Sequence, residues 1–186
     1  MIVSLHQPNF MPWLPFFDKI KKSDIFVILG YCQFEKNNFQ NRFMIDERWH
    51  TLRVKKGNKP IIEKEYVDSK EDWETIKRKL PKHRIALENM DYCISDNLLL
   101  TNTRIIKHIC KELKITTEIV SDFPTELKRS ERLLEICKKY NATHYLSGPS
   151  GINYLDAKIF KKSNIDILYQ DNSKLSKKAI LQCLTP

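Results

Sequence analysis

The stretch HQPNFMPWLP, residues 6–15, places polar side chains in a turn that contains three prolines, directly behind an apolar run. Each proline fixes its own φ near about −65° and biases the preceding residue toward extended backbone. A turn of this kind can hold His6, Gln7 and Asn9 at defined positions. A neutral imidazole there could hydrogen-bond a phosphate oxygen or act as acid or base near neutral pH. The alternative is that His6 only hydrogen-bonds the backbone at the end of a strand.

A second group of polar side chains follows in FEKNNFQNR, residues 34–42. Amide side chains suit sugar hydroxyls, and an arginine can bind a carboxylate or phosphate through two parallel hydrogen bonds. We expect Phe34 and Phe39 to anchor this segment, which argues against a plain solvated loop. The donors that it offers are Lys36, Asn37, Asn38, Gln40, Asn41 and Arg42.

The turn SGPSG, residues 147–151, is the third stretch with chemical potential. Small residues let a backbone approach a ligand closely, and the amides of a helix expected to begin near Ile152 would point at an anion. The stretch lacks both the Walker pattern and G-x-G-x-x-G, so its phosphate signal is weak by itself. A tight turn with Ser150 as helix N-cap is the alternative, and both could hold together.

Other kinds of site find little support in the sequence. The histidines and aspartates lack metal-ligand spacing, so we predict no metal site. The chain also lacks a G-x-S-x-G serine-hydrolase elbow. Its five cysteines include no C-x-x-C pair, and Cys32 is at most a minor candidate for a nucleophile.

The elements that must position these side chains alternate along the chain. Apolar runs rich in β-branched residues predict buried strands, and stretches with apolar residues at helical spacing predict helices. This alternation favours a three-layer α/β domain with a mostly parallel sheet and right-handed crossovers. The predicted strands are 2–5, 24–29, 115–120, 144–147 and 165–170, and the predicted helices around them are 14–20, 130–140 (with Ser130 as cap) and 152–163.

The region from about 49 to 112 is predicted to be an insertion at the edge of the sheet. WHTLRV, residues 49–54, alternates like a half-exposed strand, and GNKP, residues 57–60, signals a turn. IIEKEYV, residues 61–67, could pair back as the second strand of a hairpin. Helical signals opened by Ser69 fill most of the remainder.

In an open parallel sheet, ligands bind beyond the carboxyl ends of the strands. The three polar stretches each follow a predicted strand. We therefore expect His6–Trp13, Gly30–Arg42 and Gly148–Asn153 to meet at one pocket.

Length and charge bound the remaining possibilities. The 186 residues suit one domain over residues 1–186. The net charge of +9 favours anionic partners such as nucleic acid, nucleotide phosphates or an anionic membrane face, although dispersed basic pairs also serve solubility. No apolar stretch approaches the ~20 residues of a transmembrane helix, and no signal-peptide pattern is visible. We expect a cytoplasmic protein without membrane insertion.

Four stretches, in this order, resemble the WbqC-like protein family over nearly the whole chain, from His6 to about Gln170. They are HQPNFMPWLPFFDKI, SDIFVILGYCQFEKNNFQNRFMI, the segment from Trp49 to Leu52, and SERLLEICKKYNATHYLSGPSGINYLD. The chain departs from the family in its last residues, DNSKLSKKAILQCLTP, where members commonly continue with further aromatic and proline-bearing sequence. The characteristic positions of the family fall here on His6, Gln7, Pro8, Pro12, Trp13, Asp18, Lys19, Asp24, Gln33, Asn41, Arg42, Ser130, Glu131, Arg132, Tyr145, Ser147, Gly148, Tyr154, Leu155 and Asp156.

The resemblance implies a transferase of bacterial O-antigen, lipopolysaccharide or capsule biosynthesis. Its expected reaction attaches an aminoacyl group such as glycine, or another acyl group, to the amine of a nucleotide-linked amino sugar. In this hypothesis His6 is the base, and Asn41 and Arg42 anchor the oxyanion or the substrate. The residues assigned to substrate binding are Gln7, Asn9, Trp13, Gln33, Lys36, Ser147, Gly148, Ser150, Gly151 and Tyr154. No cofactor is certain; the expected donor is an aminoacyl-tRNA, an acyl carrier or an acid activated with ATP.

A fainter likeness connects the chain to the nucleotidyltransferase superfamily, and with it to a Rossmann-like fold of the HUP or nucleotidyltransferase type. The turn of that superfamily carries paired histidines, but Pro12-Trp13-Leu14 stands where the second one is expected. ATP-dependent activation of a small acid therefore stays open as an alternative. A third alternative is a non-catalytic module that binds nucleotide sugar or RNA, although the aromatic platform motif of common RNA modules is absent. The oligomeric state is not predicted.

Overall fold

A computed structural model describes residues 1–176 and 178–184. Its main sheet has five parallel strands in the order β5-β2-β1-β6-β7. From β1 the chain adds β2 and β5 on one side and later β6 and β7 on the other, so the direction of winding reverses between β1 and β6. This arrangement confirms the predicted three-layer α/β fold. The strands are β1 (Ile2–His6), β2 (Ile25–Ile28), β5 (Glu118–Ser121), β6 (His144–Ser147) and β7 (Asp166–Tyr169).

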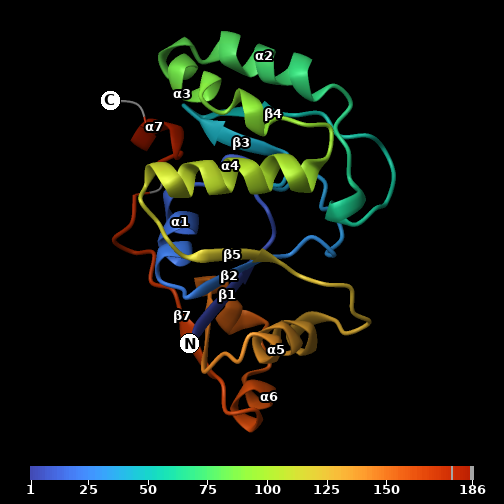
Figure 1. Ribbon diagram of the computed structural model, residues 1–186, viewed down its shortest axis with the longest axis vertical. Coiled ribbons are helices and arrows are strands. Elements are labelled where there is room, and N and C mark those ends of the chain that lie inside the picture. Colours follow the sequence, from blue (N-terminus) through green and yellow to red (C-terminus); the bar gives the residue numbers. More distant parts are fainter. Residues whose placement is uncertain (177, 185–186) are drawn as a thin grey trace.

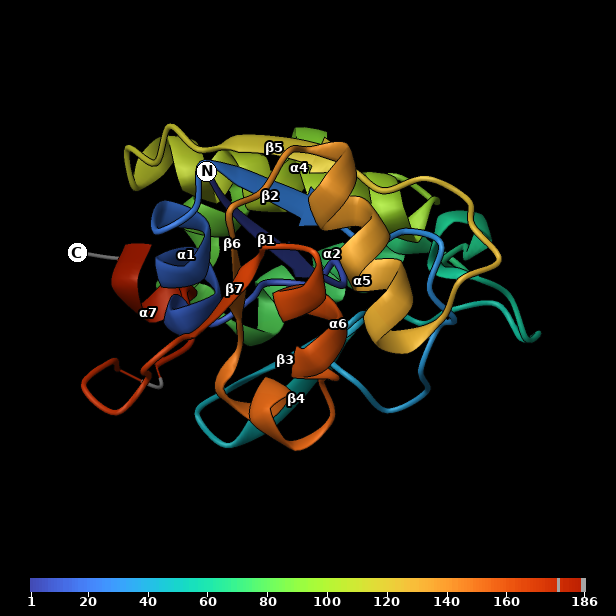
Figure 2. The same ribbon diagram turned by 90° about the horizontal axis from the view of Figure 1, so that it is seen from below.

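Helices cover both faces of this sheet. The helices α1 (Leu14–Lys21) and α4 (Leu98–Glu112) lie on one face, whereas α5 (Arg129–Lys139) and α6 (Ala157–Lys162) lie on the other (Figure 1). Figure 2 shows α5 and α6 on the near side of the strands. The alternation of side chains along β2 explains the two layers, because Phe26 points into the core beneath α1 and α4, and Val27 into the core beneath α5 and α6.

The insertion between β2 and β5 carries its own two-stranded sheet, formed by β3 (Arg42–Ile45) and β4 (Arg48–Thr51). Asp46 and Glu47 make the tight turn between them with φ of 48° and 60°. In Figure 1 this hairpin lies beyond α4, beside α2 (Ser69–Lys79) and α3 (Arg84–Glu88). The shorter elements are the 3-10 turns Ile61–Glu63, Pro81–His83, Asp91–Cys93 and Pro149–Asn153, and the terminal helix α7 (Leu181–Leu184).

The predicted pairing of 61–67 with the strand at 49–54 is confirmed only at its end. Val54 and Tyr66 form an antiparallel bridge, and the Lys55 and Val67 amides donate to the Glu65 and Arg53 carbonyls at 2.9 and 2.8 Å. The rest of the prediction was wrong, because β4 pairs with β3 and Ile61–Glu63 forms a 3-10 turn. Pro60 explains part of this, because it offers no N–H to a strand ladder. The Ile61 amide instead donates to the Cys32 carbonyl, 2.8 Å away, which ties the turn to the loop after β2.

Three predicted helix starts also need correction. The cap of α2 is Asp68 and not Ser69, since the Asp68 carboxylate accepts a hydrogen bond from the Glu71 amide at 2.9 Å. Ser130 lies inside α5, where its hydroxyl accepts from the Asp156 amide. The helix expected near Ile152 begins at Ala157, because Pro149–Asn153 turns as a 3-10 segment first and Asp156 then caps α6.

Candidate active site

A cavity of about 540 Å³ opens at the carboxyl end of β1, and we call it the β1 cavity. The turn after β1, the loop after β2, strand β3 and the C-terminal segment supply its walls. Its position agrees with the rule that ligands bind beyond the carboxyl ends of parallel strands. The lining residues are His6, Gln7, Asn9, Met11, Pro12, Trp13, Asn38, Phe39, Phe43, Met44 and Ala179.

Among the residues that the structure describes, the lining of the β1 cavity contains no lysine, arginine, aspartate or glutamate, although the chain carries a net charge of +9. Its polar groups besides the imidazole are the amides of Gln7, Asn9 and Asn38. Two large aromatic side chains remain open to solvent, Trp13 at 42% and Phe39 at 47% exposure. Aromatic faces beside a few placed amides suit an uncharged ring that bears hydroxyl groups.

His6 is the last residue of β1, and its ring packs edge-on against Phe16 at 4.9 Å between centroids. The Nδ1 atom lies 2.8 Å from the Gln7 carbonyl oxygen. Because a carbonyl oxygen only accepts, this contact assigns the proton to Nδ1 and leaves the lone pair on Nε2. Within the described chain Nε2 has no hydrogen-bond partner, so it is free to accept one from a ligand.

Burial lowers the pKa of His6 to about 4, and the positive charge of Lys19 lowers it further against the opposing bond to Gln7. The imidazole is therefore neutral at pH 7. Lys19 itself is 3% exposed, and its ammonium donates to the Leu5 carbonyl at 2.8 Å. Burial also lowers the pKa of Lys19, to about 7. No carboxylate pairs with it among the described residues.

The insertion holds the turn after β1 in place through one buried amide. Asn102 of α4 donates both Nδ2 protons, to the Pro8 carbonyl at 2.8 Å and to the Gln40 carbonyl at 2.7 Å. Its Oδ1 accepts from the buried Tyr66 hydroxyl at 3.1 Å. The side chain of Gln40 in turn donates to Gln7 Oε1 at 2.7 Å. The turn is therefore fixed by these bonds as well as by its prolines.

The backbone joins the two loops as well, since the Phe10 amide donates to the Phe39 carbonyl at 2.8 Å. The expectation that Met11 is extended was wrong, because its φ is 48°. A left-handed conformation at a non-glycine residue costs on the order of 1 kcal/mol and requires support from its surroundings. Here the loop contacts and the burial of Met11, which is 2% exposed, supply that support.

The two anchors proposed for the oxyanion lie outside the lining of the β1 cavity. Asn41 is 7% exposed, and its Nδ2 donates to the Leu52 carbonyl at 2.8 Å, so it extends the pairing of the hairpin. Arg42 donates to the Asn37 carbonyl and stacks over Trp49, with the guanidinium carbon 4.0 Å from the ring centroid. The neighbouring Phe39 and Met44 do line the cavity, which puts Arg42 close to its rim.

The residues predicted around SGPSG also lie outside this lining. Ser147 is fully buried, because Gly151 packs against its hydroxyl, whereas Ser150 and Tyr154 are exposed. Gly148 has open space beside it. This stretch therefore makes a tight turn beside the cavity, and without the expected helix start it presents no helical amides.

The remaining predicted site residues occupy the loop after β2. Gln33 donates from Nε2 to the Lys59 carbonyl at 2.8 Å, which braces the GNKP turn, and Lys36 is exposed. Four predicted residues, His6, Gln7, Asn9 and Trp13, do meet in the β1 cavity. Among the lining residues that received no role, Ala179 comes from the C-terminal segment and forms an isolated bridge with Trp13.

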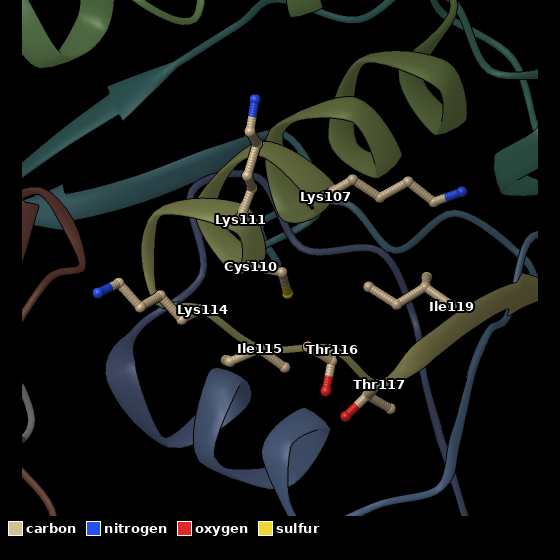
Figure 3. Close-up of a pocket in the computed structure, with 8 residues that line it drawn as sticks. All are labelled: Lys107, Cys110, Lys111, Lys114, Ile115, Thr116, Thr117 and Ile119. Atoms are coloured by element: carbon tan, nitrogen blue, oxygen red, sulfur yellow. The ribbon is translucent and has the colours of Figure 1, made fainter.

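A second hollow, of about 400 Å³, lies between the end of α4 and the start of β5. Figure 3 shows the amines of Lys107, Lys111 and Lys114 pointing away from one another, so they do not converge on a small anion. Burial raises the pKa of Cys110 to about 12, so its thiol is not activated. This hollow lies at the amino end of an edge strand, opposite the end that carries His6, and we do not assign the chemistry to it.

The described ranges, 1–176 and 178–184, contain no group of three histidine, cysteine, aspartate or glutamate side chains arranged to hold a metal ion. No helix in these ranges is both long and apolar enough to cross a membrane.

Comparison with known proteins extends the resemblance seen in the sequence. The chain is 29% identical over 188 residues to the uncharacterized protein Rv1507c of Mycobacterium tuberculosis, an alignment that covers 91% of this chain and 81% of that protein. No solved structure matches the chain significantly. The model of the WbqC-like protein family matches residues 7–177, which include the turn, loop and strand ends described above. The chain therefore belongs to the WbqC-like protein family.

Proposed function

We propose that this protein transfers an aminoacyl group of the glycyl type, or another acyl group, to the amine of a nucleotide-linked amino sugar. The observation that carries the proposal is a neutral His6 with an unpartnered Nε2 in the lining of a cavity whose described walls are amides, apolar side chains and aromatic rings. The sugar ring would lie against Trp13 and Phe39, with its hydroxyls bonded to the amides. A role in surface-polysaccharide biosynthesis follows as part of this proposal.

The reaction needs one proton acceptor and donors for the oxyanion. The amine nitrogen attacks the acyl carbon, the C–N bond forms, and the carbonyl electrons move onto oxygen. When that oxyanion collapses, the bond to the leaving oxygen or sulfur breaks, and the proton released by nitrogen passes through His6 Nε2 to the leaving group. A pKa of about 4 makes His6 an acceptor that orients the amine first. The negative charge that develops nearby would then raise the pKa of His6 and allow it to take the proton.

The oxyanion donor that we favour is Asn9, which lines the cavity. Asn41 is the weaker choice, because its amide is already committed to the Leu52 carbonyl. Arg42 stays a candidate for the diphosphate or for an anionic donor at the rim. Adenylylation of an acid with ATP is less favoured, since the described residues of the cavity lining offer no charged side chain to a triphosphate.

The first test is binding. Trp13 fluorescence should respond to a nucleotide-linked amino sugar, and Trp13→Ala should weaken that binding about tenfold because an aromatic contact with the ring is lost. Tyr154→Ala removes a more exposed aromatic residue outside the cavity and should leave the affinity unchanged. Binding that depends on Tyr154 and not on Trp13 would place the sugar elsewhere.

The second test is turnover with the same acceptor and a glycyl-tRNA or acyl-carrier donor, followed by the mass of the product. His6→Ala should reduce the rate at least about 100-fold, as expected for loss of a proton-transferring group. His108→Ala, outside the cavity, should not change it. Full activity of His6→Ala would overturn the proposal, and ATP-dependent release of pyrophosphate without a sugar product would favour activation of an acid.

A further inference from the structure

A third cavity, of about 600 Å³, lies at the turn end of the β3–β4 hairpin, and we call it the hairpin cavity. Its walls come from the turn, from β4 and from the end of α2, and they include Asp46, Arg48, His50 and Lys79. The register pairs Phe43 with His50, and only the first of these lines the β1 cavity. The two linings share no residue among those described, so the two cavities are different spaces.

The cations of the hairpin cavity are unpaired. Neither Arg48 nor Lys79 forms an ion pair in the part of the chain that the structure describes. Nearby basic residues do: Arg53 pairs with Asp72 at 2.7 Å, and Lys77 pairs with Asp91 at 2.9 Å. The carboxylate of Asp46 lines the same cavity but is within ion-pair distance of neither cation, so two unpaired positive charges and one negative charge face this space.

His50 adds a buried imidazole to this group. It is 6% exposed and stacks on Phe43 at 5.3 Å, and its Nδ1 has no hydrogen-bond partner among the described residues. Burial lowers the pKa of His50, and the positive charges of Lys79 and Arg48 lower it further. Asp46 is the opposing charge, and its carboxylate accepts from Gln182 Nε2 at 3.3 Å.

The chemistry of this cluster selects the ligand. The two cations outnumber the carboxylate of Asp46, which favours an oxyanion over a metal ion, and an oxyanion can accept several charge-assisted hydrogen bonds at once. A stacked base is less suitable, because Arg42 already covers the ring of Trp49 in the same wall. We propose that the hairpin cavity binds a phosphate group, held by Arg48, Lys79 and His50. This inference does not depend on the acyl-transfer reaction.

The test follows the His50 imidazole by NMR as pH is varied, with and without inorganic phosphate. Bound phosphate should raise the pKa of His50, because a negative charge beside the ring favours the imidazolium. Chloride at the same ionic strength should not reproduce the change, since it only screens the two cations. A response to chloride equal to that of phosphate, or no response to phosphate, would overturn the proposal.

Matched variants distinguish a specific phosphate site from attraction by the overall positive charge of the protein. Arg48→Gln with Lys79→Gln should lower phosphate affinity at least about tenfold, because two charge-assisted bonds are lost. Lys138→Gln with Lys158→Gln removes the same charge from exposed positions elsewhere and should leave the affinity intact. Equal losses in both pairs would mean an adventitious ion only and would overturn the site.

Comparing inorganic phosphate with a phosphate monoester, glucose 1-phosphate, shows whether the site binds free phosphate or a phosphorylated metabolite. Tighter binding of the monoester than of inorganic phosphate would indicate a phosphorylated metabolite, and equal binding would indicate free phosphate. Either outcome supports the site, provided that Arg48→Gln with Lys79→Gln weakens both ligands. If neither ligand is weakened, phosphate binds elsewhere and the proposal fails.

Discussion

His6 and Lys19 are ionisable groups whose protonated forms folding disfavours. Burial lowers the pKa of His6 from its usual 6.5 to about 4, and that of Lys19 from 10.5 to about 7. In each interval the unfolded chain binds more protons than the folded chain, so the free energy of unfolding rises with pH. At pH values below its pKa in the folded chain, each group lowers the free energy of unfolding by its full amount. At pH values above its pKa in the unfolded chain, it has no such effect.

The prediction is that stability increases in two steps, between pH 4 and 6.5 and again between pH 7 and 10.5. Denaturant unfolding at a series of pH values measures both steps. His6→Gln should flatten the lower step, because it removes that titrating group. Lys19→Met should remove the upper step and also reduce the lower one, because the charge of Lys19 helps to lower the pKa of His6. An upper step that survives in Lys19→Met would assign it to another residue.

Gly151 gives a second prediction at this scale. A Cβ added there would lie 2.0 Å from Ser147 Oγ and 3.0 Å from a Leu155 methyl carbon. Gly151→Ala should therefore lower the free energy of unfolding by about 1–3 kcal/mol through overpacking. Gly148→Ala is the matched control, since no heavy atom lies within 4 Å of its added Cβ, and it should change stability by less than about 0.5 kcal/mol.

A double variant measures how much of the stability lost in Gly151→Ala is due to the Ser147 hydroxyl. Ser147→Ala combined with Gly151→Ala removes the atom that clashes most closely and should recover part of the lost stability, as measured by denaturant unfolding. Equal effects of Gly148→Ala and Gly151→Ala would contradict the packing described for this turn.

Among the elements, α4 connects the insertion to the site. Asn102 bonds the carbonyls of Pro8 and Gln40 from a fully buried position. Asn102→Asp replaces two donors with a carboxylate facing two carbonyls, and should lower the free energy of unfolding by at least about 3 kcal/mol. It should also speed hydrogen exchange at the Phe10 amide, which bonds Phe39 across the two loops.

Asn89→Asp is the control, since Asn89 is exposed at the end of α3 and the same change of charge should have little effect there. Comparable destabilisation in the two variants would mean that charge, and not the lost donors, causes the effect. Exchange at Phe10 that stays unchanged in Asn102→Asp would show that the prolines alone hold the turn.

The helices and strands differ in how well the sequence predicts them. The central strands β1, β2 and β6 are short apolar runs, and burial on both faces makes such runs visible in a sequence. β3 was missed because its apolar run, FMI, has only three residues within a polar, irregular stretch, and because it pairs only with β4. The role of Asn102 was missed because its carbonyl partners lie 94 and 62 residues away.

At the scale of the whole molecule, the expected sheet topology indicated the position of the β1 cavity better than the composition of short motifs did. The turn after β1 was expected at the carboxyl ends of the strands, and four of its predicted residues meet in the β1 cavity. SGPSG has the composition of a ligand turn, yet packing of Gly151 on Ser147 turns it away from the cavity. Composition alone could not foresee a packing contact of that kind.

The position of β1 in the middle of the sheet has a consequence for how the protein is made. β1 pairs with β2 on one side and with β6 on the other, where Ser4 is level with Leu146. Translation runs from the amino to the carboxyl end, so β1 leaves the exit tunnel before Asn102 and β6 have been made. β1 therefore gains its second neighbouring strand, and His6 its final surroundings, only after residues 144–147 have been translated.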